Sequence, residues 1–136
     1  MKFIDTNIFV RYLAGDDEKK SEACFRLFQR VQRGEEPVTT AEVIIAEVAY
    51  VLSSPSLYHL SHEEIVARLA PILSLRSFQL RYKRTYLRAL ELYATYPSLD
   101  FEDALAVAHM ERQHISEIVT YDRDFDRMPN IKRSEP

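Results

Sequence analysis

Residues 1–13 read MKFIDTNIFVRYL, and this stretch decides the class of fold that we expect. Residues 2–4 suit a short strand, and the apolar spacing of residues 7–13 predicts a short helix capped by Asp5 or Thr6. A carboxylate therefore stands where a strand passes directly into a helix. Ligands of α/β folds bind at the carboxyl ends of the strands, so the question is whether other acids reach the same edge.

The rest of the chain continues this alternation of strands and helices. Further helices are predicted over residues 16–33, 41–54, 61–74, 83–96 and 101–113, and further strands over residues 37–39, 78–82, 117–120 and around Ile131. Strands that alternate with helices imply crossover connections and a mostly parallel central sheet covered by helices. We expect one α/β domain over residues 1–136.

Composition narrows the class of protein. The 136 residues are 46% hydrophobic and 29% charged, a balance that supports one core without disulfides. Cys24 is the only cysteine, and we expect it to be a buried apolar residue rather than a nucleophile. The N-terminus lacks a signal-peptide pattern, and no apolar run approaches the ~20 residues that span a bilayer, so we expect a cytoplasmic protein without membrane contact.

Two acids follow predicted strands. Asp5 follows the first strand, and Asp122 follows the strand EIVT at residues 117–120. The carboxyl ends of parallel strands lie at one edge of a sheet, so both acids are expected to share one site. Asp103 lies in the first turn of the helix over residues 101–113. It can belong to the same site, or it can simply cap the helix and complement the helix dipole.

Glu47 lies in AEVIIAEVAYVL, residues 41–52, on or beside the apolar face of the predicted helix. A carboxylate there is unfavourable unless it is paired or bound to metal; the alternative is a side chain at the edge of the face that reaches water. Glu42 is expected to face solvent. Of the acids after Asp122, Asp124 is ambiguous and Asp126 is assigned to a solvated turn.

Convergence of Asp5, Glu47, Asp103 and Asp122 would raise their pKa values, because like charges disfavour ionisation. A hard divalent cation relieves this repulsion, and oxygen-only ligands favour Mg²⁺ or Mn²⁺. The four histidines form no closed zinc set, and most of them are expected at the surface.

Four motifs carry a resemblance to a known family. FIDTNIFVRYL (3–13), IIAEVAYVL (44–52), FEDALAVAHM (101–110) and VTYDRDF (119–125), in this order, resemble PIN-domain ribonucleases and, among them, VapC-type toxins of toxin–antitoxin pairs. The resemblance covers nearly the whole chain. It implies a PIN-like three-layer α/β/α fold whose short, mostly parallel central sheet has about four to five strands.

The resemblance also implies an activity and its residues. Asp5, Glu47, Asp103 and Asp122 would be the catalytic and metal-binding acids of an endoribonuclease that hydrolyses RNA with Mg²⁺ or Mn²⁺ and metal-activated water. Supporting roles fall to Asn7, Thr120 and Asp124. The implied partners are an RNA substrate, a cognate antitoxin and a second copy of the chain.

A basic stretch bears on RNA. LRSFQLRYKRTYLRAL, residues 75–90, contains no acid and interleaves tyrosines with cations. Such a surface can follow a phosphate backbone and stack bases, and the alternative is ordinary solvated charge. The candidate RNA-binding residues are Arg81, Lys83, Arg84 and Arg88.

Two other functions fit an α/β fold with acids at strand ends. One is magnesium-dependent phosphotransfer, by an Asp-nucleophile phosphatase or a receiver-like domain. The phosphatase needs a second acid two residues after the first, where this chain has Asn7. The other is a non-catalytic PIN-like binding module, against which the intact acidic set argues.

Overall fold

The computed structural model describes residues 1–15 and 18–136. Its strands are β1 (Lys2–Phe3), β2 (Val38–Thr39), β3 (Glu117–Val119) and β4 (Lys132–Ser134). Its helices are α1 (Thr6–Ala14), α2 (Glu18–Gln32), α3 (Glu42–Ser53), α4 (His62–Leu73), α5 (Lys83–Thr95) and α6 (Phe101–Arg112), and a short 3₁₀ helix covers Arg123–Arg127. The predicted cap of the second helix, at Asp16 or Asp17, lies outside the described residues.

Local signals explain where several helices begin and end. The Ser61 hydroxyl accepts a hydrogen bond from the Glu64 amide at 3.1 Å, as expected of a capping box. Gly15 ends α1 with a φ of 65°, a left-handed conformation that glycine adopts without strain. Asp5 holds the N-cap position of α1 but makes no capping hydrogen bond with its side chain. Its carboxylate oxygens are therefore not used to start the helix.

The strands pair in parallel, as predicted, but they form two separate sheets. β1 pairs with β2, and β3 pairs with β4. The predicted strand over residues 78–82 is reduced to a single parallel bridge between Phe78 and Val38. The α/β class is therefore confirmed, whereas the expected continuous sheet is divided in the described part of the chain.

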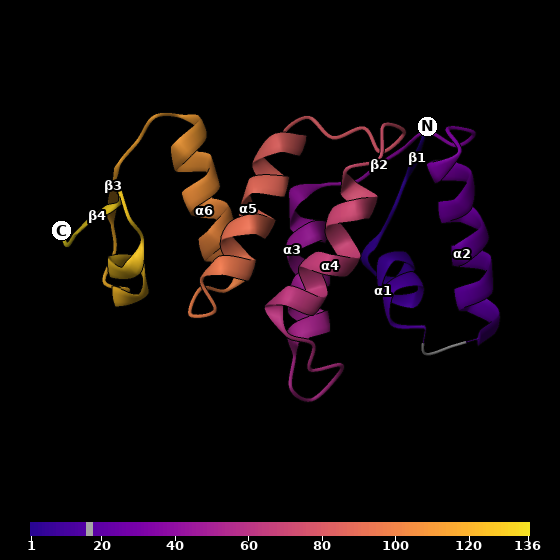
Figure 1. Ribbon diagram of the computed structural model, residues 1–136, viewed down its shortest axis with the longest axis horizontal. Coiled ribbons are helices and arrows are strands. Elements are labelled where there is room, and N and C mark those ends of the chain that lie inside the picture. The colour runs from indigo at the N-terminus through magenta and orange to yellow at the C-terminus, as the bar shows by residue number, and fades with distance from the viewer. Residues whose placement is uncertain (16–17) are drawn as a thin grey trace.

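Helices occupy the space between the two sheets. Figure 1 shows an elongated molecule with β1, β2, α1 and α2 toward one end, β3 and β4 at the other, and α3 to α6 between them. Strands of two or three residues form few ladder hydrogen bonds, so helix packing decides their positions.

Apolar side chains of the helices form one extended core. Phe9 of α1 lies with its ring centroid 5.8 Å from that of Phe28 and 5.7 Å from that of Phe78. Tyr93 of α5 meets Phe101 of α6 edge to face at 5.8 Å. Cys24 is buried, as predicted. In the described residues, no helix combines the length and apolar character needed to cross a membrane.

Candidate active site

The first acidic pair lies where β1 passes into α1. Asp5 and Glu47 line the same cavity of about 330 Å³. The Thr6 hydroxyl donates a hydrogen bond of 2.6 Å to Glu47 Oε2, so the first turn of α1 positions the glutamate of α3. The cavity is completed by Thr6, Asn7, Val10 and Val51.

Glu47 reaches this cavity from the solvent edge of α3. Ile45, Val48, Ala49 and Leu52 are the buried residues of this helix, whereas Glu47 is exposed. Glu47 is thus a residue at the edge of the apolar face whose side chain reaches water, which was the alternative interpretation.

Glu42 has a different environment from the one expected. Instead of facing solvent alone, its carboxylate contacts His109 Nε2 of α6. His62 is also engaged, because its ring stacks on Tyr93 with centroids 3.6 Å apart. Glu42 keeps a side chain that is 42% exposed, as expected, but helix packing also gives it a partner. His59 and His114 are exposed, as expected of most histidines, whereas His62 and His109 are half-buried against other helices.

The second acidic pair consists of Asp103 in α6 and Asp122 after the end of β3. Burial raises the pKa of the Asp103 carboxyl to about 6, and the charges of Asp100 and Asp122 add to this effect. Asp100 also caps α6 by accepting a hydrogen bond of 2.8 Å from the Asp103 amide. Asp103 and Asp122 therefore act on each other electrostatically, although they are far apart in the sequence.

Hydrogen bonds fix the backbone around Asp122. The Thr120 hydroxyl accepts from the Asp122 amide at 3.0 Å, and Asp122 Oδ1 accepts from the Asp124 amide at 2.9 Å. Asp122 thereby caps the 3₁₀ helix with one carboxylate oxygen. Asp124 contributes its backbone amide to this turn. Thr120, directly after β3, connects the turn to the strand through its hydroxyl.

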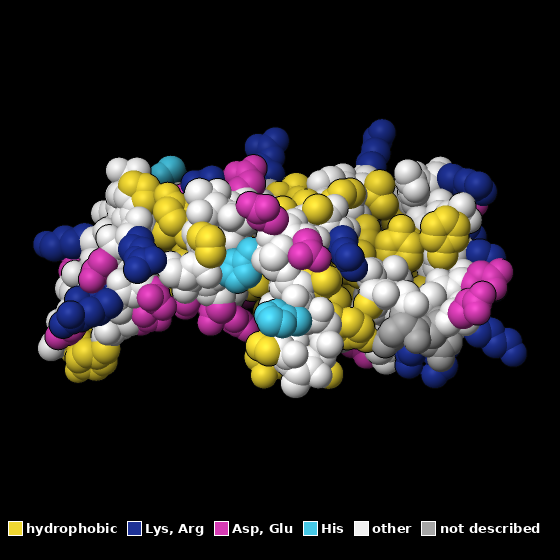
Figure 2. Space-filling model, turned by 60° about the horizontal axis from the view of Figure 1, so that its bottom comes forward, with side chains coloured by type: hydrophobic (Ala, Val, Ile, Leu, Met, Phe, Trp, Pro, Cys, Tyr) yellow, Lys and Arg dark blue, Asp and Glu magenta, His cyan; other side chains and the backbone are white. Residues whose placement is uncertain are grey.

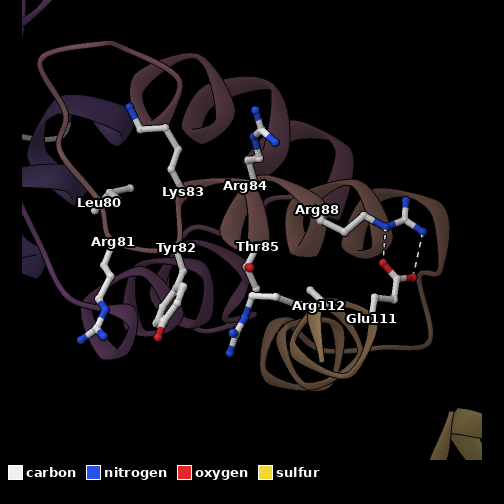
Figure 3. A pocket seen from close by; sticks show the side chains of 10 residues that line it. Leu80, Arg81, Tyr82, Lys83, Arg84, Thr85, Arg88, Glu111 and Arg112 are labelled. Carbon is white, nitrogen blue, oxygen red and sulfur yellow. Dashed lines mark hydrogen bonds and ion pairs between the residues drawn. The ribbon is translucent and has the colours of Figure 1, made fainter. Parts of the chain in front are cut away.

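The basic stretch lines a second and larger cavity, of about 600 Å³, between α5 and α6. Two of its cations already have partners in the protein. Lys83 Nζ donates to the Leu75 carbonyl at 2.5 Å, and Arg88 binds both carboxylate oxygens of Glu111, at 2.8 and 3.1 Å. Figure 3 shows the Arg88–Glu111 pair. Of the predicted RNA-binding residues, Lys83 and Arg88 therefore use their charged groups for contacts within the protein.

A further cation in this cavity was not predicted. Arg112, in the last turn of α6, lies with its guanidinium 4.4 Å from the ring centroid of Tyr82, and that of Arg81 lies at 5.4 Å. Figure 3 shows Arg81, Tyr82 and Arg112 pointing to one side and Lys83 and Arg84 to the other. The only sequence signal was a cation in the last turn of a helix, which the helix dipole also explains.

The family model described as PIN domain matches residues 2–131. The chain belongs to the PIN domain family. Both acidic pairs and the basic cavity fall within the matched range, so the predicted resemblance is confirmed, and membership argues against the phosphotransfer alternatives.

Relatives of this PIN domain match along almost the whole chain. A VapC ribonuclease of Aquifex aeolicus (strain VF5) is 27% identical over 128 residues, which are 94% of this chain and 92% of the relative. VapC ribonuclease Mb1869c of Mycobacterium bovis (strain ATCC BAA-935 / AF2122/97) and ribonuclease VapC13 of Mycobacterium tuberculosis (strain ATCC 25618 / H37Rv) are each 26% identical over 135 residues, 98% of either chain.

The PIN domain divides its candidate metal ligands between two places. Each pair offers only carboxylate and hydroxyl oxygens, the ligands that Mg²⁺ prefers. However, within residues 1–15 and 18–136 no three acid, histidine or cysteine side chains lie close enough to hold a metal ion. The structure places Asp5 with Glu47 and Asp103 with Asp122 in two separate pairs, because β1 and β3 belong to different sheets, and the assignment of the four acids to one metal site stays a prediction.

Proposed function

We propose that this PIN domain is a divalent-metal-dependent endoribonuclease and the toxin of a type II toxin–antitoxin pair. The observation that carries the proposal is the match to VapC ribonucleases over 94% to 98% of the chain. Both acidic pairs lie within residues 2–131, which the PIN domain model matches. Mg²⁺ or Mn²⁺ would be the cofactor, because the candidate ligands are oxygen atoms.

The acids would form the reactive part of the site. In this proposal Asp5 and Glu47 act as one half, with Thr6 holding the Glu47 carboxylate and Asn7 lining the same cavity. Asp103 and Asp122 act as the other half. Thr120 and Asp124 keep Asp122 in place through the two hydrogen bonds of its turn.

RNA would approach over the cavity between α5 and α6. The guanidinium groups of Arg81 and Arg112 both lie over the Tyr82 ring, and this pair of cations can hold a phosphate of the RNA backbone. Arg84 is an exposed cation of the same cavity. Lys83 and Arg88 would contribute mainly by fixing the start of α5 and its contact with α6.

The partner that controls the activity would be a cognate antitoxin in the cytoplasm. Val43 and Tyr50 of α3 are exposed apolar side chains, at 69% and 66%. They flank Glu47 at helical spacing, so a protein segment that covers them would also cover the first acidic pair.

The test is cleavage of single-stranded RNA with Mg²⁺ present. The wild type should cleave, EDTA should abolish cleavage, and Asp5→Asn and Glu47→Gln should each lower the rate by at least about a hundredfold while thermal unfolding stays cooperative. Glu63→Gln on α4, an exposed glutamate far in sequence from the acids, is the matched control and should keep full activity. Cleavage that persists in EDTA, or a Glu47→Gln protein as active as Glu63→Gln, would contradict the proposal.

A further inference from the structure

Arg133 is a half-buried cation in β4. Its side chain is 15% exposed, and its guanidinium donates three hydrogen bonds. Nε donates to Asp126 Oδ1 at 2.9 Å, and Nη1 donates to the Thr120 carbonyl at 3.1 Å and to Glu135 Oε1 at 2.9 Å. A guanidinium is planar and presents its donors in a fixed fork, so it fixes the positions of its partners relative to one another.

Two of these partners stand on either side of Asp122. Thr120 precedes Asp122, and Asp126 belongs to the 3₁₀ helix that Asp122 caps. The sequence predicted that Asp126 lies in a solvated turn, and its side chain is 51% exposed, yet its carboxylate is bound to a residue of β4. One guanidinium therefore connects the start and the end of the segment 120–126 that contains Asp122. We call the contacts of Arg133 with Thr120 and Asp126 the Arg133 bridge.

Thr120 transmits this constraint to Asp122. Its amide donates to the Ser134 carbonyl at 2.9 Å, its carbonyl accepts from Arg133, and its hydroxyl accepts from the Asp122 amide at 3.0 Å. The backbone of Asp122 therefore cannot shift without the loss of one of these hydrogen bonds. Because Asp122 Oδ1 accepts from the Asp124 amide, the orientation of the carboxylate also depends on the turn.

Apolar packing gives this part of the chain little support. Of residues 117–136, all of which the structure describes, only Phe125 and Met128 are buried. Figure 1 shows β3, β4 and the 3₁₀ helix together at the C-terminal end of the molecule. Strands of three residues supply few ladder hydrogen bonds, and a segment with few buried apolar contacts opens easily. Polar contacts such as the Arg133 bridge therefore carry much of the order in the turn.

We infer that Arg133 is the positioning residue of Asp122, and that the Arg133 bridge holds the Asp122 carboxylate in the orientation that its role in the acidic set requires. The effect on the turn is independent of the chemistry, whereas the effect on metal binding and cleavage rests on the proposed function. Groups that orient the ligands of a metal typically change metal affinity or activity by about 10–100-fold when they are removed. The PIN domain model matches residues 2–131, so Arg133 lies beyond the part of the chain that the family model describes.

The first test measures the turn itself and needs neither metal nor RNA. In the wild type the backbone amides of Asp122 and Asp124 should have NMR order parameters typical of rigid backbone, about 0.85. Arg133→Gln removes the guanidinium and should lower both to below about 0.6, while the amides of α5 keep their values. Arg127→Gln is the matched control, because it removes the same charge from an exposed position of the 3₁₀ helix, and it should change neither value.

Asp126→Asn is a second variant that weakens one end of the Arg133 bridge without changing β4. It should lower the order parameters of Asp122 and Asp124 in the same direction, so the inference can be tested even if Arg133→Gln does not fold. Unchanged order parameters in both variants would overturn the Arg133 bridge.

The second test asks whether the order of the turn matters for metal and RNA. In Arg133→Gln, Mn²⁺ binding measured by calorimetry without RNA should weaken about 10–100-fold. At saturating Mn²⁺, kcat for cleavage of single-stranded RNA should fall at least about tenfold while KM stays within about threefold, because Asp122 acts on the reaction rather than on substrate binding. Glu135→Gln removes the partner of Arg133 that lies outside the turn, and this control should keep both properties.

Chemical rescue separates positioning from a general loss of stability. Millimolar guanidinium should restore part of kcat in Arg133→Ala, and NaCl at the same concentration should not. Guanidinium is a denaturant, so a protein that is merely destabilised would lose activity instead of regaining it. A wild type that cleaves RNA and an Arg133→Gln variant with the same kcat and Mn²⁺ affinity would overturn the positioning role. A wild type that cleaves no RNA, with order parameters that change as expected, would retain the Arg133 bridge and reject the proposed function.

Discussion

At the scale of single residues, Asp103 is the acid whose charge the fold disfavours. Its pKa is raised from 3.8 to about 6 by burial and by the charges of Asp100 and Asp122. An acid that is harder to ionise in the folded state than in the unfolded state destabilises the fold at neutral pH. The penalty is present above pH 6 and is lost as the pH falls through 6 toward 3.8.

Asp103→Asn should therefore stabilise the metal-free protein. We expect the free energy of unfolding at pH 7 to rise on the order of 1 kcal/mol, after discounting for solvent screening at a partly exposed site. The measurement is denaturant unfolding in EDTA. Glu102→Gln, in the same helical turn, is the control and should not stabilise. The difference between Asp103→Asn and wild type should shrink at pH 4.5; a difference that grows on acidification would contradict the assigned cause.

At the scale of elements, the contact between Glu42 and His109 joins α3 to α6. These helices carry Glu47 and Asp103, so the contact helps to fix the relative positions of the two acidic pairs. Buried or half-buried hydrogen bonds to charged groups contribute more to stability than exposed ion pairs.

A double-mutant cycle of Glu42→Ala and His109→Ala should reveal this coupling. Each single change should destabilise by about 1 kcal/mol, and the double variant should lose about 0.5–1 kcal/mol less than the sum. Glu42→Ala combined with His59→Asn, a residue on the loop after α3, serves as the comparison and should be additive. Additivity of the Glu42 and His109 changes would show that the contact does not hold the helices together.

At the scale of the whole molecule, charge is unevenly placed. The chain has a net charge of -3, yet the cavity between α5 and α6 gathers arginines. Figure 2 shows acidic and basic side chains interspersed over this face, with basic side chains at both ends of the elongated molecule. An RNA backbone would therefore be attracted more to this cavity than to the rest of a chain with a net negative charge.

Salt dependence of RNA binding should identify the attracting residues. In an Asp5→Asn background that blocks cleavage, Arg81→Gln with Arg112→Gln should flatten the log–log salt slope by about 1.4, since each phosphate contact contributes about 0.7. Arg88→Gln should instead lower stability and leave the slope unchanged, because its guanidinium is bound to Glu111. A slope that responds to Arg88→Gln but not to the Arg81/Arg112 pair would place the RNA elsewhere.

The sequence by itself determined the local structure and the kinds of residue at the site. Helices formed where apolar periodicity and caps predicted them, because both act between residues that are close along the chain. The positions of Asp5 after β1, Asp122 after β3 and Asp103 in the first turn of α6 follow from the same local signals. The family could be predicted for the same reason, since its motifs are short and ordered.

Only the tertiary structure decided which elements are neighbours. Strands of two or three residues carry too little pattern to specify a partner, so the division into two sheets, and with it the separation of the acids, could not be predicted. The partners of Glu42, Lys83 and Arg88 likewise come from segments distant in sequence or from the opposite side of a turn. The role of a charged side chain depends on which groups tertiary packing places beside it. The apolar periodicity of a sequence does not specify these neighbours.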